Sequence, residues 1–436
     1  MAICVLYPSL FSENLTRLFR NLRVPRGRNG ARFMANSRES SQSPTKLVTF
    51  LGKGGSGKTT AAVLAAKYYA SEGLRTCLVI HSQDPTAEQL MGCKIGSGPS
   101  PTECSDNLSA VKLETSKMLL EPLNRMKKVD ARLNLTQGVL QGIVGEELGV
   151  LPGMDSIFSA LALQKLVNFR SDERNAAPKE FDMVIYDGIS TEETLRLIGV
   201  TERARWYLKY MRSMSEKTDI GRLTSPSLLK LAYDSINLNS GISEGKTSTD
   251  IWNEVEQILE RASASFTDSS KFRCYLVMDP MRSVSISCAL RYWGCAIQAG
   301  THICGALGFN PQSYAVTQEV AEKFSPLSFA LLPYIGTDPF VEWETKLDCL
   351  DQSTKDLLGA DIYFRPSVTF DSLQKTVTLF MPGFDKSEVK LYQYRGGSEL
   401  LVEAGDQRRI IKLPPNMHGK VIGAKFTDRN LVVKLR

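Results

Sequence analysis

The stretch Gly52-Lys53-Gly54-Gly55-Ser56-Gly57-Lys58-Thr59 matches the pattern G-x-x-x-x-G-K-[ST]. An apolar run at 46–51 precedes it, and an Ala-rich, helix-favouring stretch follows from Thr60 to about residue 72. This strand, loop and helix context separates a phosphate-binding loop from a chance match. Glycines let backbone N–H groups turn toward phosphate oxygens, and the start of the helix adds a favourable dipole. The stretch, with Thr60, therefore predicts a P-loop that binds ATP. Lys58 should reach the β- and γ-phosphates, and Thr59 should ligate Mg²⁺.

Two further apolar runs, at 76–80 and 181–186, are followed by carboxylates, Asp84 and Asp187 respectively. A carboxylate at the carboxyl end of a parallel strand faces the ligand crevice. Asp187 is expected to hold a water of the Mg²⁺ shell, and Asp84 is a catalytic candidate that could orient the attacking water. The alternative at Asp84 is an ordinary Asp-Pro turn.

Three more buried-strand candidates at 275–278, 305–309 and 329–332 alternate with helix-favouring stretches. This alternation predicts the α/β class, with the doubly wound and mostly parallel sheet of a P-loop NTPase. From residue 361 the sequence pattern changes to roughly seven short strands of alternating apolar and polar residues, which predict a small all-β sandwich. We therefore expect an ATPase domain at 46–345, a linker at 346–360 and a sandwich at 361–436.

The 436 residues exceed what one hydrophobic core usually holds, which agrees with two domains. No apolar run reaches the roughly 18 residues that a membrane-spanning helix needs.

Basic charge is concentrated at the ends: residues 1–46 carry eight Lys/Arg against two Asp/Glu, residues 361–436 carry 13 against eight, and the remainder carries 32 against 37. A mildly acidic body argues against a nucleic-acid partner. None of the nine cysteines forms a C-x-x-C pair, so no zinc site is expected.

Residues 1–45 do not have the composition of a folded domain. Seven arginines and two glutamates, with leucines at helical spacing, predict an organelle transit peptide and a linker. A disordered basic tail is the alternative. Plastid and mitochondrial presequences share these features, so the segment does not choose between the two organelles.

The glycine loop, Asp84-Pro85, the Leu-Pro-Gly-Met-Asp segment at 151–155 and Asp187 with Thr-Leu-Arg-Leu-Ile at 194–198 resemble the ArsA and guided-entry ATPase family. The resemblance covers about residues 46–345. It implies a homodimer in which Lys53 takes a catalytic role by reaching the partner's nucleotide; a solvated loop lysine is the alternative. It also implies that Asn310 reads the adenine and that Pro333 packs beside the base.

The same resemblance implies a helical subdomain, formed by insertions at about 112–170 and 192–265, with an apolar groove. In the family such a groove binds an apolar helix of a membrane-protein client, and a membrane receptor is a further partner. Ordinary helix–helix core is the alternative for these apolar stretches. Two segments depart from the family pattern. Thr86-Ala87-Glu88 stands where a histidine is usual, and residues 188–193 replace the usual Thr-Ala-Pro-Thr-Gly-His.

The segment Met381-Pro382-Gly383-Phe384 and the late strand at 431–435 resemble the α-crystallin domain of small heat-shock proteins. We expect the sandwich to pack on the ATPase or to offer it another binding surface. The fusion resembles the plastid and cyanobacterial branch of the guided-entry ATPases. It therefore favours the chloroplast stroma over the mitochondrial matrix.

Together these features predict a homodimeric, ATP-hydrolysing targeting factor or chaperone that releases its client under nucleotide control. One alternative is a metalloid-anion pump ATPase subunit, which would need a cysteine cluster, and Cys93 with Cys104 is what the sequence offers. A ParA-like positioning ATPase would lack the helical insertions. A nucleotide-gated scaffold with little hydrolysis is the remaining alternative.

Overall fold

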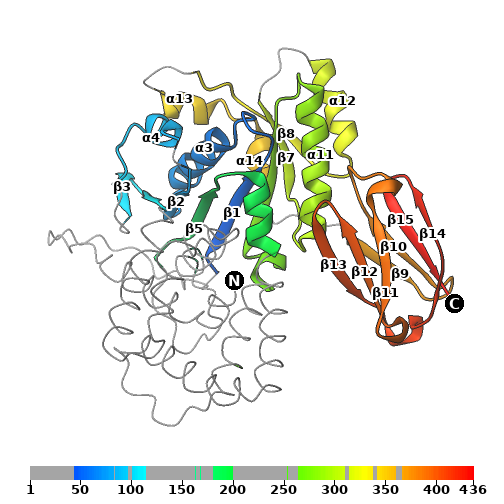
Figure 1. Cartoon of the computed structure of the whole chain (residues 1–436). Helices are drawn as coiled ribbons and strands as arrows, with labels where there is room; N and C mark the ends of the chain where they lie inside the picture. Colours follow the sequence, from blue (N-terminus) through cyan, green and yellow to red (C-terminus); the bar gives the residue numbers. More distant parts are fainter. Residues whose placement is uncertain are drawn as a thin grey trace, which may run out of the picture.

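The computed structural model describes residues 44–82, 84–96, 101–113, 163, 167, 180–199, 253, 264–309, 314–336, 341–359 and 366–436. An α/β body and a β-sandwich lie side by side, with the long helix α11 (Ser283–Gln298) between the sheet of the body and the sandwich (Figure 1). The predicted transit peptide, most of both predicted helical insertions and Asn310 lie outside the described residues, so these remain predictions.

The body is built on an eight-stranded sheet with the order β3-β4-β2-β5-β1-β6-β7-β8. Every neighbouring pair is parallel except β3 with β4, which confirms the predicted mostly parallel sheet. All six predicted strands are present. The strands are β1 (Lys46–Leu51), β2 (Thr76–Ile80), β3 (Thr102–Ser105), β4 (Leu108–Lys112), β5 (Met183–Asp187), β6 (Phe272–Met278), β7 (Gly305–Phe309) and β8 (Phe329–Leu332).

Helices cover both faces of this sheet, so its central strands are buried throughout. Side chains alternate between the faces: Leu47 and Leu51 of β1 join one core cluster, whereas Val48 and Phe50 join the other. The Ala-rich helix α3 (Lys58–Ser71) packs on the second face, and α11 packs on the first (Figure 1). This is the doubly wound arrangement that the sequence predicts.

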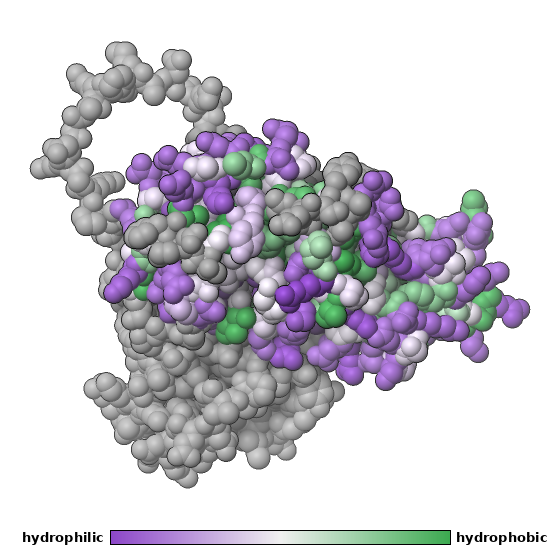
Figure 2. Space-filling view, turned by 90° about the horizontal axis from the view of Figure 1, so that it is seen from above, coloured by the Kyte–Doolittle hydropathy of each residue, from purple (hydrophilic) through white to green (hydrophobic). Residues whose placement is uncertain are grey.

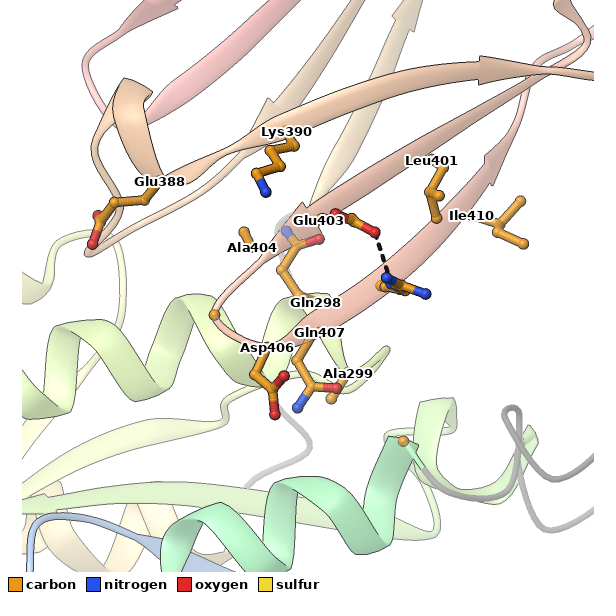
Figure 3. Close-up of a pocket in the computed structure, with 13 residues that line it drawn as sticks. Gln298, Ala299, Glu388, Lys390, Leu401, Glu403, Ala404, Asp406, Gln407 and Ile410 are labelled. Atoms are coloured by element: carbon orange, nitrogen blue, oxygen red, sulfur yellow. Dashed lines mark ion pairs between the residues drawn. The ribbon is translucent and has the colours of Figure 1, made fainter.

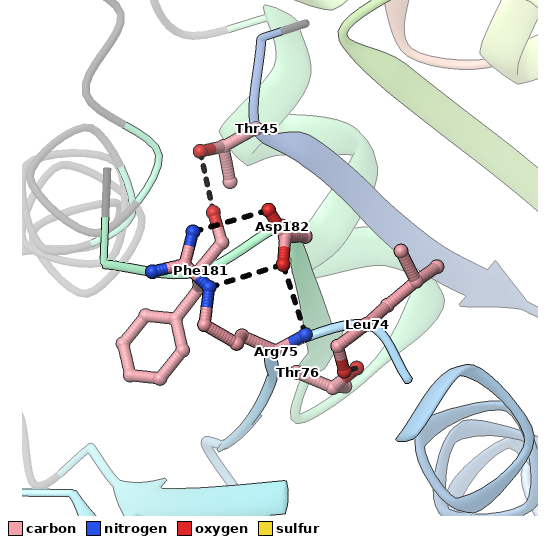
Figure 4. Close-up of polar contacts among 6 residues, drawn as sticks. All are labelled: Thr45, Leu74, Arg75, Thr76, Phe181 and Asp182. Carbon is pink, nitrogen blue, oxygen red and sulfur yellow. Dashed lines mark hydrogen bonds and ion pairs between the residues drawn. The ribbon is translucent and has the colours of Figure 1, made fainter. Parts of the chain in front are cut away.

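The amino ends of the central strands are tied together by polar contacts (Figure 4). The Arg75 guanidinium, just before β2, donates to both carboxylate oxygens of Asp182, just before β5, at 3.2 Å. The Arg75 backbone N–H also donates to Asp182, at 3.0 Å, and the Thr45 hydroxyl donates to the carbonyl of Phe181 at 2.8 Å. These contacts help to set the register in which the opposite, carboxyl ends of the strands meet.

The linker predicted at 346–360 is wrong. Helices α13 (Trp343–Asp348) and α14 (Gln352–Gly359) occupy it, and Leu357 and Leu358 are buried in the body. The hydroxyls of Tyr275 and Tyr69 donate to the carbonyls of these two leucines at 3.0 and 2.9 Å. The α/β body therefore continues to residue 359. The helices α4 (Thr86–Met91) and α12 (Tyr314–Phe324) and the helical residues 191–199 also belong to it. Within that part, no helix combines the length and apolar character needed to cross a membrane.

The C-terminal strands form the predicted sandwich, with one sheet in the order β14-β15-β10-β9 and the other β11-β12-β13. Val377 and Val433 from the first sheet and Leu400 and Val402 from the second are fully buried between them. The strands are β9 (Val368–Asp371), β10 (Thr376–Phe380), β11 (Lys390–Tyr394), β12 (Glu399–Ala404), β13 (Gln407–Lys412), β14 (Val421–Thr427) and β15 (Asn430–Leu435).

The sandwich packs against α11, and the two bodies share one hydrophobic core cluster. The rings of Trp293 and Phe380 meet edge to face with centroids 5.2 Å apart. Gly294 lies so close to the Pro382 carbonyl that any added Cβ would overlap it. Of the two roles expected for the sandwich, packing on the ATPase is therefore present in the structure.

Candidate nucleotide-binding site

The P-loop joins β1 to α3 and needs glycine at both of its ends. A Cβ at Gly52 would overlap the Val277 carbonyl of β6, and one at Gly57 would overlap the ring of Phe309 from β7. Gly57 also has a φ of 91°, which L-residues with side chains rarely adopt. In contrast, nothing lies within 4 Å of a Cβ built at Gly54 or Gly55. The middle of the loop therefore faces open space, as a phosphate cradle must.

Lys58 and Thr191 converge on the backbone of Gly52. The Thr191 hydroxyl accepts from the Gly52 N–H at 2.8 Å and donates to the Gly52 carbonyl at 2.7 Å. The Lys58 ammonium donates to the same carbonyl at 3.1 Å. Burial lowers the pKa of Lys58, and the carboxylates of Asp187 and Glu192 act in the opposite direction. Lys58 is thus held inside the loop among carboxylates, where a phosphate could replace its present partners.

Asp187 is the last residue of β5, which neighbours β1, and its side chain is buried. The Thr59 hydroxyl hydrogen-bonds this carboxylate, whose Oδ2 has no hydrogen-bond partner among the described residues. Burial raises the pKa of Asp187 to about 6, although the Thr59 hydroxyl and the Lys58 cation oppose the rise. A hydroxyl beside a buried carboxylate with an unpartnered oxygen is a donor set that suits Mg²⁺. The Ser56 hydroxyl, also buried, likewise lacks a partner among the described residues and leaves the loop one more free donor.

Asp84 lies after β2, at the start of α4, with its side chain exposed. Its carboxylate accepts from the Thr86 hydroxyl and from the Thr86 backbone N–H, the latter at 2.8 Å. These bonds, the one from the hydroxyl first, lower the pKa of Asp84. The charge of Asp84 also raises the pKa of Asp187. Asp84 therefore closes the Asp-Pro turn and lies within electrostatic reach of the loop.

The remaining predicted site residues are Lys53, Pro333 and Asn310. Lys53 is exposed at its tip. Pro333 is half-buried directly after β8, three strands away from β1. Asn310 is not described, but its neighbour Phe309 rests on Gly57. The end of β7 therefore reaches the loop, as the predicted adenine contact requires.

Thr191 and Glu192 were not predicted as site residues. They begin the helical residues 191–199, in the segment that departs from the family pattern. Glu192 accepts a hydrogen bond from the Tyr292 hydroxyl of α11 at 2.6 Å. Glu192 is exposed. Partial desolvation of its carboxylate opposes ionisation, but the Tyr292 hydroxyl and the Lys58 cation help to lower its pKa. The acidic pair Glu192-Glu193 shortly after Asp187 was the available signal, whereas nothing in the sequence singled out Tyr292.

A separate hollow of about 660 Å³ lies where the end of α11 meets the β12–β13 hairpin (Figure 3). Its wall includes the buried Gln298 and the carboxylates of Glu388, Glu403 and Asp406, with Glu403 paired to Arg408 at 2.7 Å. No P-loop residue lines it. Its charged wall does not suit an apolar helix, so the hollow is not the groove that the sequence predicts.

A P-loop between a buried strand and a helix, with a buried aspartate ending the neighbouring strand, defines a P-loop NTPase. The family described as anion-transporting ATPase matches residues 45–291, and the HSP20-like domain found in ArsA matches residues 374–435. The chain therefore belongs to the ArsA ATPase family, in a form with a C-terminal HSP20-like domain.

Curated relatives agree with this assignment. A Chlorobaculum tepidum protein named as an arsenical pump-driving ATPase is 26% identical over 406 residues, which cover 88% of this chain and 94% of that protein. The ATPase GET3 of Zygosaccharomyces rouxii is 27% identical over 239 residues, or 52% of this chain and 62% of that protein. The ATPase ASNA1 homolog 1 of Paramecium tetraurelia is 31% identical over 151 residues, or 34% of this chain and 41% of that protein. The chain is an ATP-binding ATPase of this family.

Proposed function

We propose that the chain works as a homodimer that binds an apolar helix of a membrane-protein client and releases it under nucleotide control. One observation carries this proposal. Thr191, which makes two hydrogen bonds to the first glycine of the P-loop, begins the helical residues 191–199, and these open the second predicted helical insertion at about 192–265. A conformational change at the phosphates can therefore pass directly from Thr191 into the start of the predicted client-binding region. The likeness to an ATPase named GET3 supports the same role.

The residues of the site fit ATP with Mg²⁺. Lys58 and the loop N–H groups would hold the phosphates, and Thr59 with Asp187 would hold the metal. Bound there, Mg²⁺ would neutralise charge on the phosphates. Asp84 is ionised at neutral pH because its pKa is lowered, so it can accept a hydrogen bond from an attacking water and orient it.

The surface around the loop supports a dimer that closes over the nucleotide. Ile189 follows β5, Met281 and Val284 follow β6, and their side chains are 49%, 61% and 60% exposed. Since β5 and β6 flank β1, these apolar side chains and the exposed Lys53 lie on the same edge of the sheet. Figure 2, which views the molecule from above, shows apolar patches among polar residues. A second copy of the chain would cover such residues and bring its own Lys53 to this site.

The test uses the purified full-length chain and a labelled peptide with one apolar helix. We expect the chain to keep the peptide soluble without nucleotide and to release it when ATP and Mg²⁺ are added. The Lys58→Ala variant should bind the peptide but not release it. Failure of the wild-type chain to bind the peptide, or release that does not depend on ATP, would contradict the proposal.

A pump-driving ATPase subunit is the second candidate, because one observation favours it. The sulfur atoms of Cys93, after α4, and Cys104, in β3, lie 2.6 Å apart. A thiol pair of this kind can bind a soft metalloid ion. Arsenite added in place of the peptide distinguishes the candidates: stimulation of ATP hydrolysis by arsenite, but not by the peptide, would favour the pump.

We also propose that the chain works in the chloroplast stroma. The arginine-rich residues 1–46 and the fusion to an HSP20-like domain support this location. Import into isolated chloroplasts tests it, because deletion of residues 1–40 should abolish import while ATP hydrolysis by the purified protein continues. Import of the truncated chain would count against the transit peptide.

A further inference from the structure

A tyrosine on α11 holds a carboxylate that acts on the ATP site. The Tyr292 hydroxyl donates to Glu192 at 2.6 Å and joins α11 to the helical residues 191–199. Neither residue is required by the P-loop pattern. Hydrogen bonds to charged groups are stronger than those between neutral groups, so this bond can hold the carboxylate in one position.

Glu192 is linked to the P-loop through its neighbour. Thr191 makes two hydrogen bonds to Gly52, and Lys58 donates to the same Gly52 carbonyl. The carboxylate of Glu192 also acts electrostatically on the Lys58 ammonium. A displacement of Glu192 therefore changes both the field at Lys58 and the support of the first loop glycine.

The residues next to Tyr292 on α11 contact the sandwich. We call this contact, between residues 290–294 of α11 and residues 380–384, the seat of the sandwich. The turn at 381–384 lies on the helix: a Cβ at Gly383 would overlap the backbone of Leu290 and Arg291. Arg291 pairs with Glu388, and its guanidinium lies 4.5 Å from the centre of the Phe384 ring. One helical turn thus contacts the sandwich on one side and holds Glu192 on the other.

A cavity of about 580 Å³ lies between these two sides, and its wall includes Glu192, Tyr292 and Gly383. Glu192 is therefore not packed tightly in place on this side. Hydrogen bonds, rather than close packing, keep its side chain where it is: the bond from Tyr292 and those from the Ser190 side chain and from its own backbone.

We infer that Tyr292 and Glu192 form a positioning pair for the ATP site, and that the sandwich turn at 381–384 fixes this pair through its seat on α11. The inference rests on ATP hydrolysis and does not depend on the proposed client. It gives the sandwich a role in setting the ATPase rate, although every predicted nucleotide-binding residue lies outside the sandwich.

The pair predicts a direction of change with pH. The bond from Tyr292 helps to lower the pKa of Glu192 against the effect of burial, so its loss should raise that pKa. The carboxylate would then become protonated at a higher pH. The charged and titratable groups that face it are Lys58 on α3 and, on α11, Tyr292, Arg291, Cys288 and Cys295.

The test compares Tyr292→Phe, Glu192→Gln and the double variant, with Tyr394→Phe as the matched control on an exposed tyrosine of the sandwich. In Tyr292→Phe we expect the acid limb of the kcat–pH profile to move to higher pH, with nucleotide affinity retained. At the acid end kcat should fall severalfold, because a solvent-exposed hydrogen bond to a charged group contributes less than a buried one. The double variant should match Glu192→Gln alone. The inference of a positioning pair would be overturned if the kcat–pH profile of Tyr292→Phe is unshifted and the losses of kcat in the two single variants add up in the double variant.

The role of the sandwich is tested at its seat. Gly294→Ala forces the seat apart, and the milder Phe384→Leu alters the ring that rests on Gly294 and Gly405 without adding a charge. Both should shift the acid limb in the same direction as Tyr292→Phe. If Phe384→Leu folds, binds nucleotide and keeps the wild-type profile, the link to the sandwich is wrong.

Discussion

At the scale of single residues, the carbonyl of Gly52 is the meeting point of the site. Lys58 from α3 and Thr191 from the segment after β5 both donate to it. Asp187 and Glu192 then supply two carboxylates around the Lys58 ammonium. The two carboxylates balance the half-buried Lys58 cation before any phosphate is bound, which reduces the free-energy cost of its partial desolvation.

The role proposed for Asp84 can be tested by Asp84→Asn. The amide oxygen can still accept from the Thr86 N–H, so the turn at the start of α4 should remain, whereas the charge is lost. We expect ATP binding to be retained and turnover to fall by roughly 100-fold or more, the usual contribution of a positioned acid–base group. Nucleotide titration and ATP turnover measure the two effects. The control Thr86→Ala removes the hydroxyl that bonds Asp84 but keeps the carboxylate. Loss of nucleotide binding in Asp84→Asn would make the residue structural.

Much of the site follows from local patterns at the residue scale. The loop glycines, Lys58, Thr59 and Asp187 lie where strand-end patterns place them, because the carboxyl ends of parallel strands meet at one edge. Thr191 and Tyr292 could not be found in this way. Their importance depends on contacts between segments that are 139 and 100 residues apart in the chain, which no local pattern records.

At the scale of elements, the buried parallel strands were predictable because short continuous apolar runs in a chain of this composition usually form buried strands. The antiparallel pair β3 and β4 was missed because β3 has four residues and alternates between partly buried and exposed positions. Asp106-Asn107 between them, with Asn107 at a φ of 58°, is the turn that could have revealed the pair.

Helix α14 shows the opposite error. Its sequence is mostly polar, so the segment resembled a linker, but Thr354, Leu357 and Leu358 give it a buried face. Arg273 and the two tyrosines Tyr69 and Tyr275 then donate to its last carbonyls. These donors satisfy groups that a helix C-terminus leaves without partners inside the helix. The partners come from β6 and α3, and so the sequence of the segment itself could not indicate them.

At the scale of the whole molecule, the sandwich and the α/β body share one core cluster and are not simply tethered. The charge difference between the acidic body and the basic C-terminal part is not the main cause of this contact. The seat is made by Trp293 on Phe380, by the close approach of Gly294 to Pro382, and by a solvent-accessible pair between Arg291 and Glu388. Exposed pairs contribute little, so the contact should persist at high salt. Gly294 inside α11 was the sequence signal, since glycine within a helix often marks a close approach.

The most direct test of the central claim, that this loop is the ATPase site, is steady-state ATP turnover by Lys58→Ala beside Lys67→Ala. Both lysines belong to α3, but Lys67 lies nine residues after Lys58, so its loss should leave hydrolysis near the wild-type rate. Lys58→Ala should show no turnover above background, because the phosphates lose their fixed cation. Hydrolysis by Lys58→Ala at the rate of Lys67→Ala would contradict the assignment of the site.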